Sequence, residues 1–496
     1  MWFTAWRKEC TVELLKVDTI EEAMEKLLGC AAGAVSLDLE GSYRTGLPLE
    51  TEEVPIFGLL GRVLAEDVVS LEAVPGFNRS TVDGYAVRSC DTGGASESMP
   101  AFLRVIGEVE MGCDASDLTV GPGECVYVPT GGMVPEGADA MVMVEYCEAF
   151  GAAAGGAAVG GAAAGEAAAD GAAVDGSGAC GASSGDASRS GAGLQMAVYS
   201  SVSAGNNMVM AGDDIACGQV VLRRGRKVRP ADMGVLSSMG RTSALVYKPW
   251  KIVILSTGDE VIDPKHVPMP GQVRDVNTYG LYGQAVEYGF DVLGFQVVED
   301  DAEVLEQRVA LAMKQADLVV VSGGSSQGKK DATAAIIGRL ASSGVLTHGL
   351  AVKPGKPTIL GFDKPSRTAL IGLPGHPVAA MILFREIVGS LWEILTGQRD
   401  TEKKPSVEGI ITANIAASPG RKTWQLVKVD FDRRPVAPEG NGGSDESHGA
   451  WLPAVTPIWG KSGLIRTLSE ADGYIIMDVN DEGVGRGQQV TVWLLG

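Results

Sequence analysis

The chain has 496 residues, of which 45% are hydrophobic, and a formal net charge of −21. This length predicts roughly three or four domains, because a single hydrophobic core stops growing well below it. The acidic balance argues against a general binder of nucleic acids or anionic membranes. An anionic ligand must therefore be bound locally, by backbone N–H groups, a few Lys or Arg side chains, or a divalent cation held by carboxylates.

The cysteines and the N-terminal residues indicate the compartment. The eight cysteines are scattered and form no C-x-x-C pair, which disfavours a zinc or redox motif and suits a reducing cytosol. The opening MWFTAWRKEC lacks the apolar core of a signal peptide, and no apolar run is long enough to cross a bilayer. We therefore expect a cytoplasmic protein.

The N-terminal region predicts helices followed by a β-rich segment. Asp18 and Thr19 can cap a helix that begins after them, and we expect a second helix over residues 56–63. From residue 102 the composition favours strands, at residues 102–109, 124–128 and 140–145.

A low-complexity insert of Gly, Ala and Ser occupies residues 151–193. It has almost nothing to bury, and its glycines oppose helix formation, so we expect it to be disordered. It lies between the β-like residues 140–145 and 194–202, as an expanded hairpin loop would.

From residue 231 helices and strands alternate. The periodicity predicts helices at 231–239, 278–288, 302–315, 332–340 and 378–395, and strands at 250–255, 291–298, 318–321 and 368–371. This alternation predicts a three-layer domain with a mainly parallel sheet. Ligands of such sheets bind at the carboxyl ends of the strands, where polar loops fall at residues 256–260, 322–331 and 373–377.

The C-terminal region after the charged linker RDTEKKP is β-like. Its pattern predicts a small barrel or sandwich, with strands at residues 409–414, 423–430, 451–457, 473–479 and 488–495. Residues 435–449 within it are expected to form a mobile loop.

The loop after the buried strand 318–321 is rich in glycine and serine. Gly323, Gly324, Ser325 and Ser326 precede Asp331, which stands just before a helix-compatible run. The free N–H groups of a helix start attract phosphate, so the loop is a candidate phosphate cradle. The alternative is an ordinary strand-to-helix loop with Asp331 as its N-cap.

Five carboxylates stand beside turns and could hold Mg²⁺, which can bridge to phosphate. Each also has a structural interpretation: Asp83-Gly84 is a common turn dipeptide, and a carboxylate before a helix can simply cap it. The five are Asp83, Asp214, Glu260, Asp275 and Asp331.

Further candidates for anion binding and catalysis, among them two lysines and a histidine, lie later in the chain. Lys353 and Lys356 either counter phosphate or belong to a solvated turn. Gly375 stands at a helix entry, and His376 is disfavoured as a catalytic base because no neighbouring residue in the sequence orients it. Patterns typical of serine hydrolases, zinc proteases, dinucleotide binders and P-loops are absent.

Taken together, the order of these segments resembles the MoeA/gephyrin E-domain family, the molybdopterin molybdenumtransferases. The resemblance runs from about Val17 to the C-terminus, apart from the insert. It is carried by VPGFNRSTVDGYAVRSCDT (74–92), GEVEMG (107–112), PTGGMVPEGADAMVMVE (129–145), STGDEV (256–261), VRDVNTYGL (273–281), SGGSSQGKKDAT (322–333), VKPGKP (352–357) and LPGHPVAA (373–380).

The resemblance implies an enzyme that inserts molybdate into adenylyl-molybdopterin with Mg²⁺ and releases AMP and molybdenum cofactor. It implies a homodimer with the active site between subunits, and a molybdopterin adenylyltransferase and molybdoenzyme maturation proteins as candidate partners. The implied fold is a three-layer α/β molybdopterin-binding domain with a β-rich protruding domain and a C-terminal β-barrel. The implied subdomains are I (17–74 and 203–246), II (75–202), III (247–398) and IV (405–496).

The family's functional positions carry over by motif. The expected catalytic residues are Asp83, Thr130, Asp214 and Glu260, and the expected metal ligands are Asp275 and Asp331. The expected cofactor-binding residues are Gly323, Gly324, Ser325, Ser326, Lys353, Lys356, Pro374 and Pro377, while Arg421 and Ser462 align in subdomain IV.

The sequence also departs from the family pattern. Ser326 or Gln327 stands where many members have an apolar residue, Lys329 where an acidic residue is usual, and His376 replaces the commoner Asn. These changes leave open whether molybdate or tungstate is preferred. The competing functions are a molybdopterin adenylyltransferase, which lacks subdomains II and IV, and a non-catalytic clustering scaffold.

Overall fold

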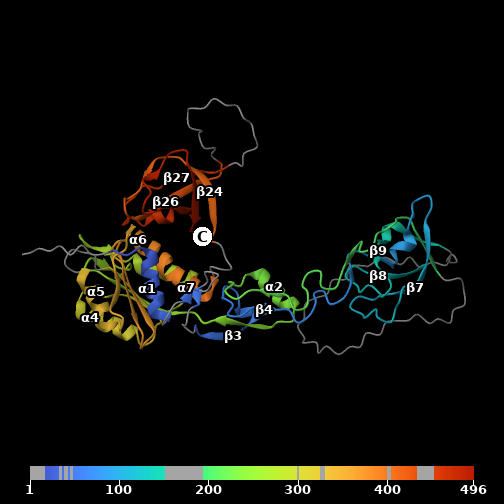
Figure 1. Ribbon diagram of the computed structural model, residues 1–496, viewed down its shortest axis with the longest axis horizontal. Coiled ribbons are helices and arrows are strands. Elements are labelled where there is room, and N and C mark those ends of the chain that lie inside the picture. Colours follow the sequence, from blue (N-terminus) through green and yellow to red (C-terminus); the bar gives the residue numbers. More distant parts are fainter. Residues whose placement is uncertain are drawn as a thin grey trace, which may run out of the picture. The chain divides into compact units, whose positions relative to one another are not determined.

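The computed structural model describes residues 17–32, 36–37, 43–44, 49–150, 194–298, 301–323, 330–398, 404–432 and 452–495 (Figure 1). The 151–193 insert and the 435–449 loop lie outside these residues. The chain divides into two compact units, described one by one below. Unit 1 comprises Met1–Asp67, Arg223–Met233 and Thr242–Gly496, and unit 2 comprises Val68–Leu222 and Gly234–Arg241.

Unit 1 contains the α/β sheet predicted from the sequence. Its strand order is β18-β15-β19-β23-β22-β20, and the first four strands are parallel. These are β15 (Lys251–Thr257), β18 (Asp291–Val298), β19 (Leu318–Gly323) and β23 (Thr368–Leu373). Antiparallel β22 (Ile359–Asp363) and β20 (Val345–His348) extend the sheet; both were missed, because they flank a segment dense in Pro and Gly.

Helices cover both faces of this sheet. Along β15, Ile252 and Ile254 pack into one core with α1 (Ile20–Ala32), α3 (Asn277–Glu287) and α7 (Ser390–Thr396), whereas Val253 and Leu255 pack into the other. The second core includes residues of α4 (Ala302–Ala312) and α5 (Lys330–Leu340), seen together on one side of the sheet in Figure 1. The three-layer prediction is therefore confirmed.

The start of α1 shows the expected cap. The Thr19 hydroxyl accepts a hydrogen bond from the backbone N–H of Glu22 at 3.1 Å, and the Glu22 carboxylate accepts one from the N–H of Thr19 at 2.9 Å. This reciprocal pair is a capping box. None of the helices in the described part of the chain is long and apolar enough to cross a membrane.

Three helix predictions need correction. Residues 56–63 form only a 3₁₀ turn at Ile56–Gly58, because Gly61 adopts a positive φ of 75° that ends any helix there. The helix expected over 378–395 is α6 (Pro377–Leu383), a π-helical turn at Phe384–Gly389, and then α7. Asp331 does not precede its helix, since α5 begins at Lys330.

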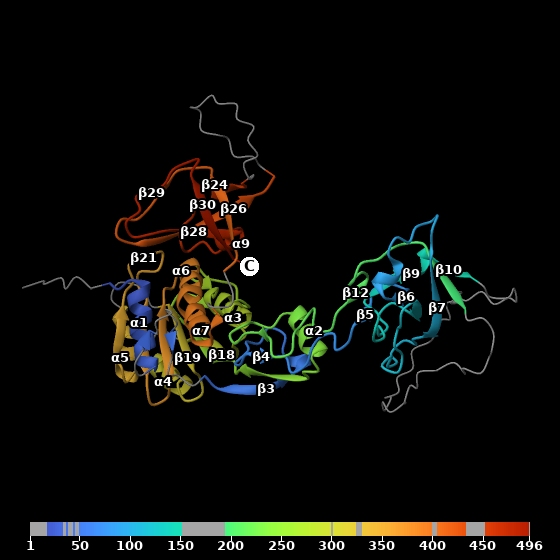
Figure 2. The same cartoon turned by 45° about the vertical axis from the view of Figure 1, so that its right-hand side comes forward.

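The C-terminal region of unit 1 is a barrel rather than a sandwich (Figure 2). Its described strands close in the ring β26-β27-β24-β30-β28, with β28 pairing back to β26. They are β24 (Ser406–Ile411), β26 (Lys422–Asp430), β27 (Ala454–Pro457), β28 (Gly473–Met477) and β30 (Gln489–Leu494). Short β21 (Val352–Lys353) pairs with β26 and so ties the barrel to the KPGKP segment.

Unit 2 is built on a β-sheet of order β10-β11-β7-β8-β6-β9. The predicted strands are β7 (Ala101–Glu108), β8 (Glu124–Val128) and β9 (Ala140–Met143), joined by β6 (Gly84–Val87). The insert connects β10 (Cys147–Phe150) to its antiparallel partner β11 (Gln195–Val198). A hairpin therefore flanks the insert as expected, but its first strand is β10 rather than β9.

Smaller elements complete both units. In unit 1, β3 (Thr51–Pro55) pairs with β14 (Ser243–Tyr247), and β16 (Val261–Ile262) with β17 (Val273–Arg274). In unit 2, β4 (Val68–Val69) pairs with β13 (Val220–Leu222), and β5 (Arg79–Ser80) with β12 (Met208–Val209). The helix predicted at 231–239 is α2 (Pro230–Ser238).

Candidate functional site

A cavity of about 760 Å³ opens at the carboxyl ends of β15, β19 and β23. Its wall includes Thr257 at the end of β15, Ser322 and Gly323 at the end of β19, and Gly375 to Pro377 after β23. Glu260, Arg274 and Asp275 from the segment between β15 and α3 also line it, together with Asn277, the first residue of α3. The cavity thus lies where the three polar loops of the sequence were expected to meet.

Gly323 ends β19 in a conformation that only glycine adopts readily. Its φ is +130°, and a Cβ on it would lie 1.9 Å from the backbone oxygen of Thr257 on the paired strand β15. Glycine therefore lets the two strands stay paired up to the cavity wall. Its expected companions Gly324, Ser325 and Ser326 lie outside the described residues.

Asn277 joins two of the polar loops around the cavity. It is 8% exposed, and its amide nitrogen donates to the Ser322 hydroxyl at 2.8 Å and to the Gly375 carbonyl at 2.9 Å. Ser322 in turn donates to the carbonyl of Pro374 at 3.3 Å. The amide oxygen of Asn277 is buried without a hydrogen-bond partner, so this group has an unused acceptor beside the cavity.

Asp275 is both a structural and a site residue. It is 6% exposed, and one carboxylate oxygen accepts a hydrogen bond from the backbone N–H of Thr278 at 3.1 Å. That contact confirms the capping interpretation, because it satisfies a free donor in the first turn of α3. Its position in the cavity wall beside Glu260 leaves a ligand role open as well.

The donor set of the cavity is compatible with Mg²⁺. Within the described ranges, no three His, Cys, Asp or Glu side chains form a group able to enclose a metal ion. Mg²⁺ needs no such cage, since it is usually held by one or two carboxylates together with water and substrate phosphates. Glu260 and Asp275 supply two carboxylates in one wall. Asp331 lies in the first turn of α5.

His376 is oriented by the barrel, contrary to the sequence expectation. Its Nδ1 lies 2.7 Å from the hydroxyl oxygen of Ser462, in the loop between β27 and β28. The carbonyl of Ser462 also accepts a hydrogen bond from the N–H of Val378 at 3.1 Å, and Gly463 lines the cavity. The partner of His376 is 86 residues away in sequence, which is why local patterns did not reveal it.

Lys353 and Lys356 are not among the described residues that line this cavity. Lys353 ends β21, which pairs with β26 of the barrel. A Cβ on the intervening Gly355 would lie 2.2 Å from the Leu383 side chain, so this loop packs closely on α6. Pro374 contributes its carbonyl to the Ser322 contact, and Pro377 is the first residue of α6.

Unit 2 carries the remaining expected site residues. The Asp83 carboxylate accepts a hydrogen bond from the backbone N–H of Thr130 at 2.8 Å, which brings these two residues together. Asp83 is exposed. Burial, followed by the charges of Asp83 and Glu108, raises the pKa of Tyr127. Asp214 is also exposed, in the turn after β12, where its N–H donates to the Val74 carbonyl.

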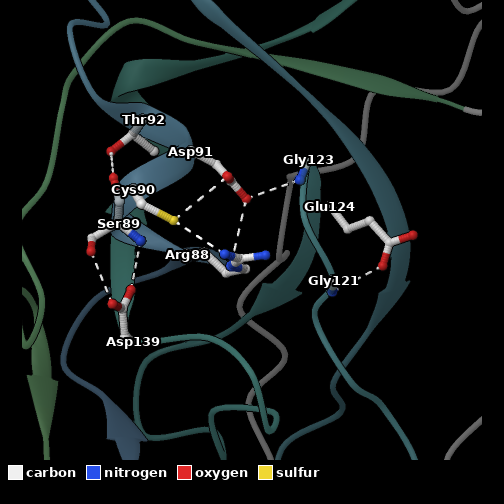
Figure 3. A network of polar contacts seen from close by, with 9 residues as sticks. All are labelled: Arg88, Ser89, Cys90, Asp91, Thr92, Gly121, Gly123, Glu124 and Asp139. Atoms are coloured by element: carbon white, nitrogen blue, oxygen red, sulfur yellow. Dashed lines mark hydrogen bonds and ion pairs between the residues drawn. The ribbon is translucent and has the colours of Figure 1, made fainter.

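A polar network fixes the motif segments of unit 2 to one another (Figure 3). Asp139 accepts hydrogen bonds from the N–H of Ser89 at 2.5 Å and from its hydroxyl at 2.9 Å. Asp91 accepts one from the N–H of Gly123 at 2.9 Å and forms an ion pair with Arg88. Arg88, Ser89, Asp91 and Asp139 of the motif segments 74–92 and 129–145 therefore have structural roles.

Sequence reasoning missed Asn277 and Ser322 as site residues. Both are polar residues adjoining apolar elements, and both are buried. Their positions in the sequence could have identified them as site residues. Asn277 stands at the start of a predicted helix, and Ser322 stands at the end of a buried strand, next to a predicted ligand-binding loop.

Three family models match the chain in sequence order. They describe the MoeA N-terminal region (domains I and II) at residues 19–240, a probable molybdopterin binding domain at 253–393, and the MoeA C-terminal region (domain IV) at 448–495.

Named relatives and solved structures agree with these matches. The Bacillus subtilis protein named molybdopterin molybdenumtransferase is 28% identical over 450 residues, covering 90% of each chain. Its Haemophilus influenzae namesake is 29% identical, covering 76% of this chain and 81% of its own. A Pyrococcus horikoshii structure, described as a molybdopterin biosynthesis MoeA protein, superposes with a TM-score of 0.66 at 28% identity, covering 97% and 99% of the two chains. The chain belongs to the MoeA family.

Proposed function

We propose that this protein is a molybdopterin molybdenumtransferase, which inserts molybdate into adenylyl-molybdopterin and releases AMP. Relatives named molybdopterin molybdenumtransferase match most of the chain at about 28% identity. The observation that carries the proposal is the cavity at the carboxyl ends of β15, β19 and β23, whose described lining residues other than Gly463 lie in the part of the chain matched by the molybdopterin-binding model.

The cavity provides groups suited to a nucleotide-bearing phosphate substrate. Glu260 and Asp275, with Asp331, are the proposed ligands of Mg²⁺. When bound, Mg²⁺ would offset the negative charge that develops as the phosphoanhydride bond is broken. Asn277 holds the Gly375 carbonyl and Ser322 in place, so that the loops around the substrate keep one arrangement.

The remaining proposed roles are divided between the units. Asp83, Thr130 and Asp214 of unit 2 are proposed to act on the adenylyl linkage or on the incoming oxyanion. Lys353 and Lys356 are proposed to bind molybdate or a terminal phosphate, and Gly323 to Ser326 to cradle the pterin phosphate. Either lysine would bind such an anion by direct charge pairing.

We further propose a cytoplasmic homodimer with the four subdomains outlined in the sequence analysis. An exposed apolar surface on α3 and β18 supports self-association, because monomeric proteins seldom leave such a patch uncovered. Phe295 is 48% exposed and contacts the rings of Tyr279 and Tyr282 at centroid distances of 6.2 and 5.3 Å.

Of the competing functions, adenylyl transfer is disfavoured by the β-rich unit and the barrel, which that enzyme lacks. A purely clustering scaffold has no need for the buried polar cavity wall formed by Asp275 and Asn277. Burying a polar atom without a hydrogen-bond partner is unfavourable, and the amide oxygen of Asn277 is such an atom.

The decisive experiment is AMP release from adenylyl-molybdopterin, measured with and without molybdate. Molybdate-dependent release supports the proposal, and its absence contradicts it. Asp83→Ala and Asp331→Ala should each abolish molybdenum cofactor formation while circular dichroism and dimer mass stay unchanged. Glu97→Ala, at an exposed carboxylate of unit 2, is the matched control and should keep wild-type turnover.

A further inference from the structure

A second cavity, of about 500 Å³, lies at the opposite end of the same sheet. Lys251 begins β15, Asp317 directly precedes β19, and Arg367 directly precedes β23, and all three line this cavity. It therefore opens at the amino ends of the strands whose carboxyl ends form the candidate active site. The two cavities share no lining residue among those described.

The floor of this amino-end cavity is apolar and reaches both cores. Leu27 of α1 is 0% exposed, and Phe362 of β22 and Leu391 of α7 are also buried. Met313, after α4, and Ala369 complete this surface. Such a floor suits the hydrocarbon or aromatic part of a ligand.

The rim is cationic, although the whole chain carries a net charge of −21. Four cations, Lys248, Lys251, Lys314 and Arg367, line the cavity, against two carboxylates, those of Glu50 and Asp317. Asp317 accepts a hydrogen bond from the backbone N–H of Lys251 at 2.8 Å, and Glu50 lies 3.0 Å from the Lys248 ammonium. Among the described lining residues, cationic side chains therefore outnumber carboxylates by four to two.

The pKa of the Glu50 carboxyl reflects the positive charges at the rim. The hydrogen bond and charge of Lys248, together with the charges of Lys251 and Arg367, lower the pKa of Glu50. Three cations, two from residues 248–251 and one from the turn at Arg367, thus act on one anion at the rim. A second anion placed beside them would experience the same attraction.

Arg367 stands at the rim in an uncommon backbone conformation. Its φ is +59°, in the left-handed region that favours glycine or asparagine. The turn is fixed by Asp363, whose carboxylate accepts hydrogen bonds from the N–H of Ser366 at 3.0 Å and its hydroxyl at 2.7 Å. A non-glycine residue in this conformation is strained, and such strain is often found at functional positions.

We propose that the amino-end cavity is a second ligand site, which binds a small organic anion with its apolar body on the floor and its carboxylate or phosphate at the cationic rim. A volume of about 500 Å³ suits a ligand of cofactor or metabolite size. The site is separate from the proposed transferase reaction and stands whether or not that activity is confirmed.

Three probes test separately whether binding needs an aromatic body and whether it needs an anionic group. 8-Anilino-1-naphthalenesulfonate has an aromatic body and an anionic group, N-phenyl-1-naphthylamine has only the aromatic body, and inorganic phosphate has only the charge. Titrating the full-length protein, we expect saturable one-site fluorescence enhancement by the sulfonate. The neutral amine and phosphate should bind at least roughly tenfold more weakly. Octanoate and AMP, as competitors, distinguish a carboxylate ligand from a phosphate ligand.

Charge variants locate the binding. Lys251→Glu/Arg367→Glu should weaken sulfonate binding by at least roughly tenfold, whereas Arg308→Glu/Lys428→Glu, which makes the same charge change at exposed positions off the cavity, should not. If the first variant does not fold, Lys251→Gln/Arg367→Asn replaces it, because asparagine tolerates the left-handed conformation. Equal affinity of variant and wild type, equally tight binding of the neutral amine, or no saturable binding would overturn the proposal.

Discussion

The imidazole Nδ1 of His376 lies 2.7 Å from the hydroxyl oxygen of Ser462, and this contact joins the α/β sheet to the C-terminal barrel at the wall of the candidate active site. A hydrogen bond on Nδ1 fixes the ring orientation and thereby determines what the other ring nitrogen can offer. The barrel therefore contributes to the cavity through His376 as well as through Gly463.

Removing this orienting hydroxyl should affect turnover more than folding. Ser462→Ala should lower kcat/KM for molybdate-dependent AMP release by roughly threefold to tenfold, the value of one ordinary hydrogen bond. Ser462→Thr keeps a hydroxyl and should retain most of the activity, and the melting temperature of both variants should stay near that of the wild type. Equal loss in the Thr and Ala variants would mean that the hydroxyl does not act through His376.

Asn277 should be needed for both stability and the shape of the cavity. Asn277→Ala removes two hydrogen bonds and leaves the Gly375 carbonyl and Ser322 hydroxyl without this donor. We expect a loss of roughly 1–3 kcal/mol in the free energy of unfolding, measured in urea, together with a raised KM. Gln284→Ala, which removes a single amide-to-carbonyl bond of the same helix to Met381, is the matched control for stability and should leave KM unchanged.

Gly323 should tolerate no side chain. Gly323→Ala would place a methyl group 1.9 Å from the Thr257 oxygen at a φ of +130°, so β15 and β19 must separate at the cavity wall. We expect a loss of about 3 kcal/mol or more in the free energy of unfolding. Gly338→Ala on α5, whose Cβ would meet its nearest neighbour at an ordinary 3.6 Å, should stabilise the protein by up to about 1 kcal/mol, because alanine favours a helix interior. Equal stability of the two variants would contradict the packing argument.

The sequence was informative wherever local pattern determines structure. The all-apolar run of β19, the capping box at Thr19 and the alternation of elements from residue 231 all reflect interactions between near neighbours, and the structure confirms them. The polar loops at the strand ends could also be placed together, because a parallel sheet brings its carboxyl ends to one edge.

Contacts between distant residues could not be predicted in the same way. The Ser462 partner of His376 and the Asn277 bond to Gly375 depend on chain segments brought together only by tertiary packing. The π-helical turn at Phe384–Gly389 was also missed. A Cβ on its last residue, Gly389, would lie 2.2 Å from the Tyr288 hydroxyl, so the turn packs closely against a residue distant in sequence.

Two thiols of unit 2 should make stability fall at alkaline pH. Burial, followed by neighbouring negative charge, raises the pKa of Cys125 and that of Cys147 from about 9 to about 12. Between these values the unfolded chain loses the protons that the folded chain keeps, so the free energy of unfolding decreases as pH rises from about 9 to about 12.

Urea unfolding at a series of pH values measures this effect. Cys125→Ala/Cys147→Ala should have a flatter alkaline slope than the wild type, and exposed Cys90→Ala/Cys217→Ala should not. In native protein at neutral pH, peptide mapping after alkylation should find Cys90 and Cys217 modified before Cys125. Rapid modification of Cys125, or an unchanged slope in its variant, would contradict this prediction.

The exposed aromatic surface on α3 and β18 should form the subunit contact of the proposed homodimer. β18 is an edge strand of the described sheet, and Phe295 and its ring neighbours Tyr279 and Tyr282 are each more than two-fifths exposed. Phe295→Arg places a charge where a dimer would bury an aromatic ring, and should raise the dimer dissociation constant at least roughly tenfold. Leu311→Arg on α4, at 53% exposure and in the helix layer that covers the other face of the sheet, is the matched control. Light scattering across a concentration series measures the dimer dissociation constant of both variants. A Phe295→Arg protein that dissociates no more readily than the control would place the subunit contact on another surface.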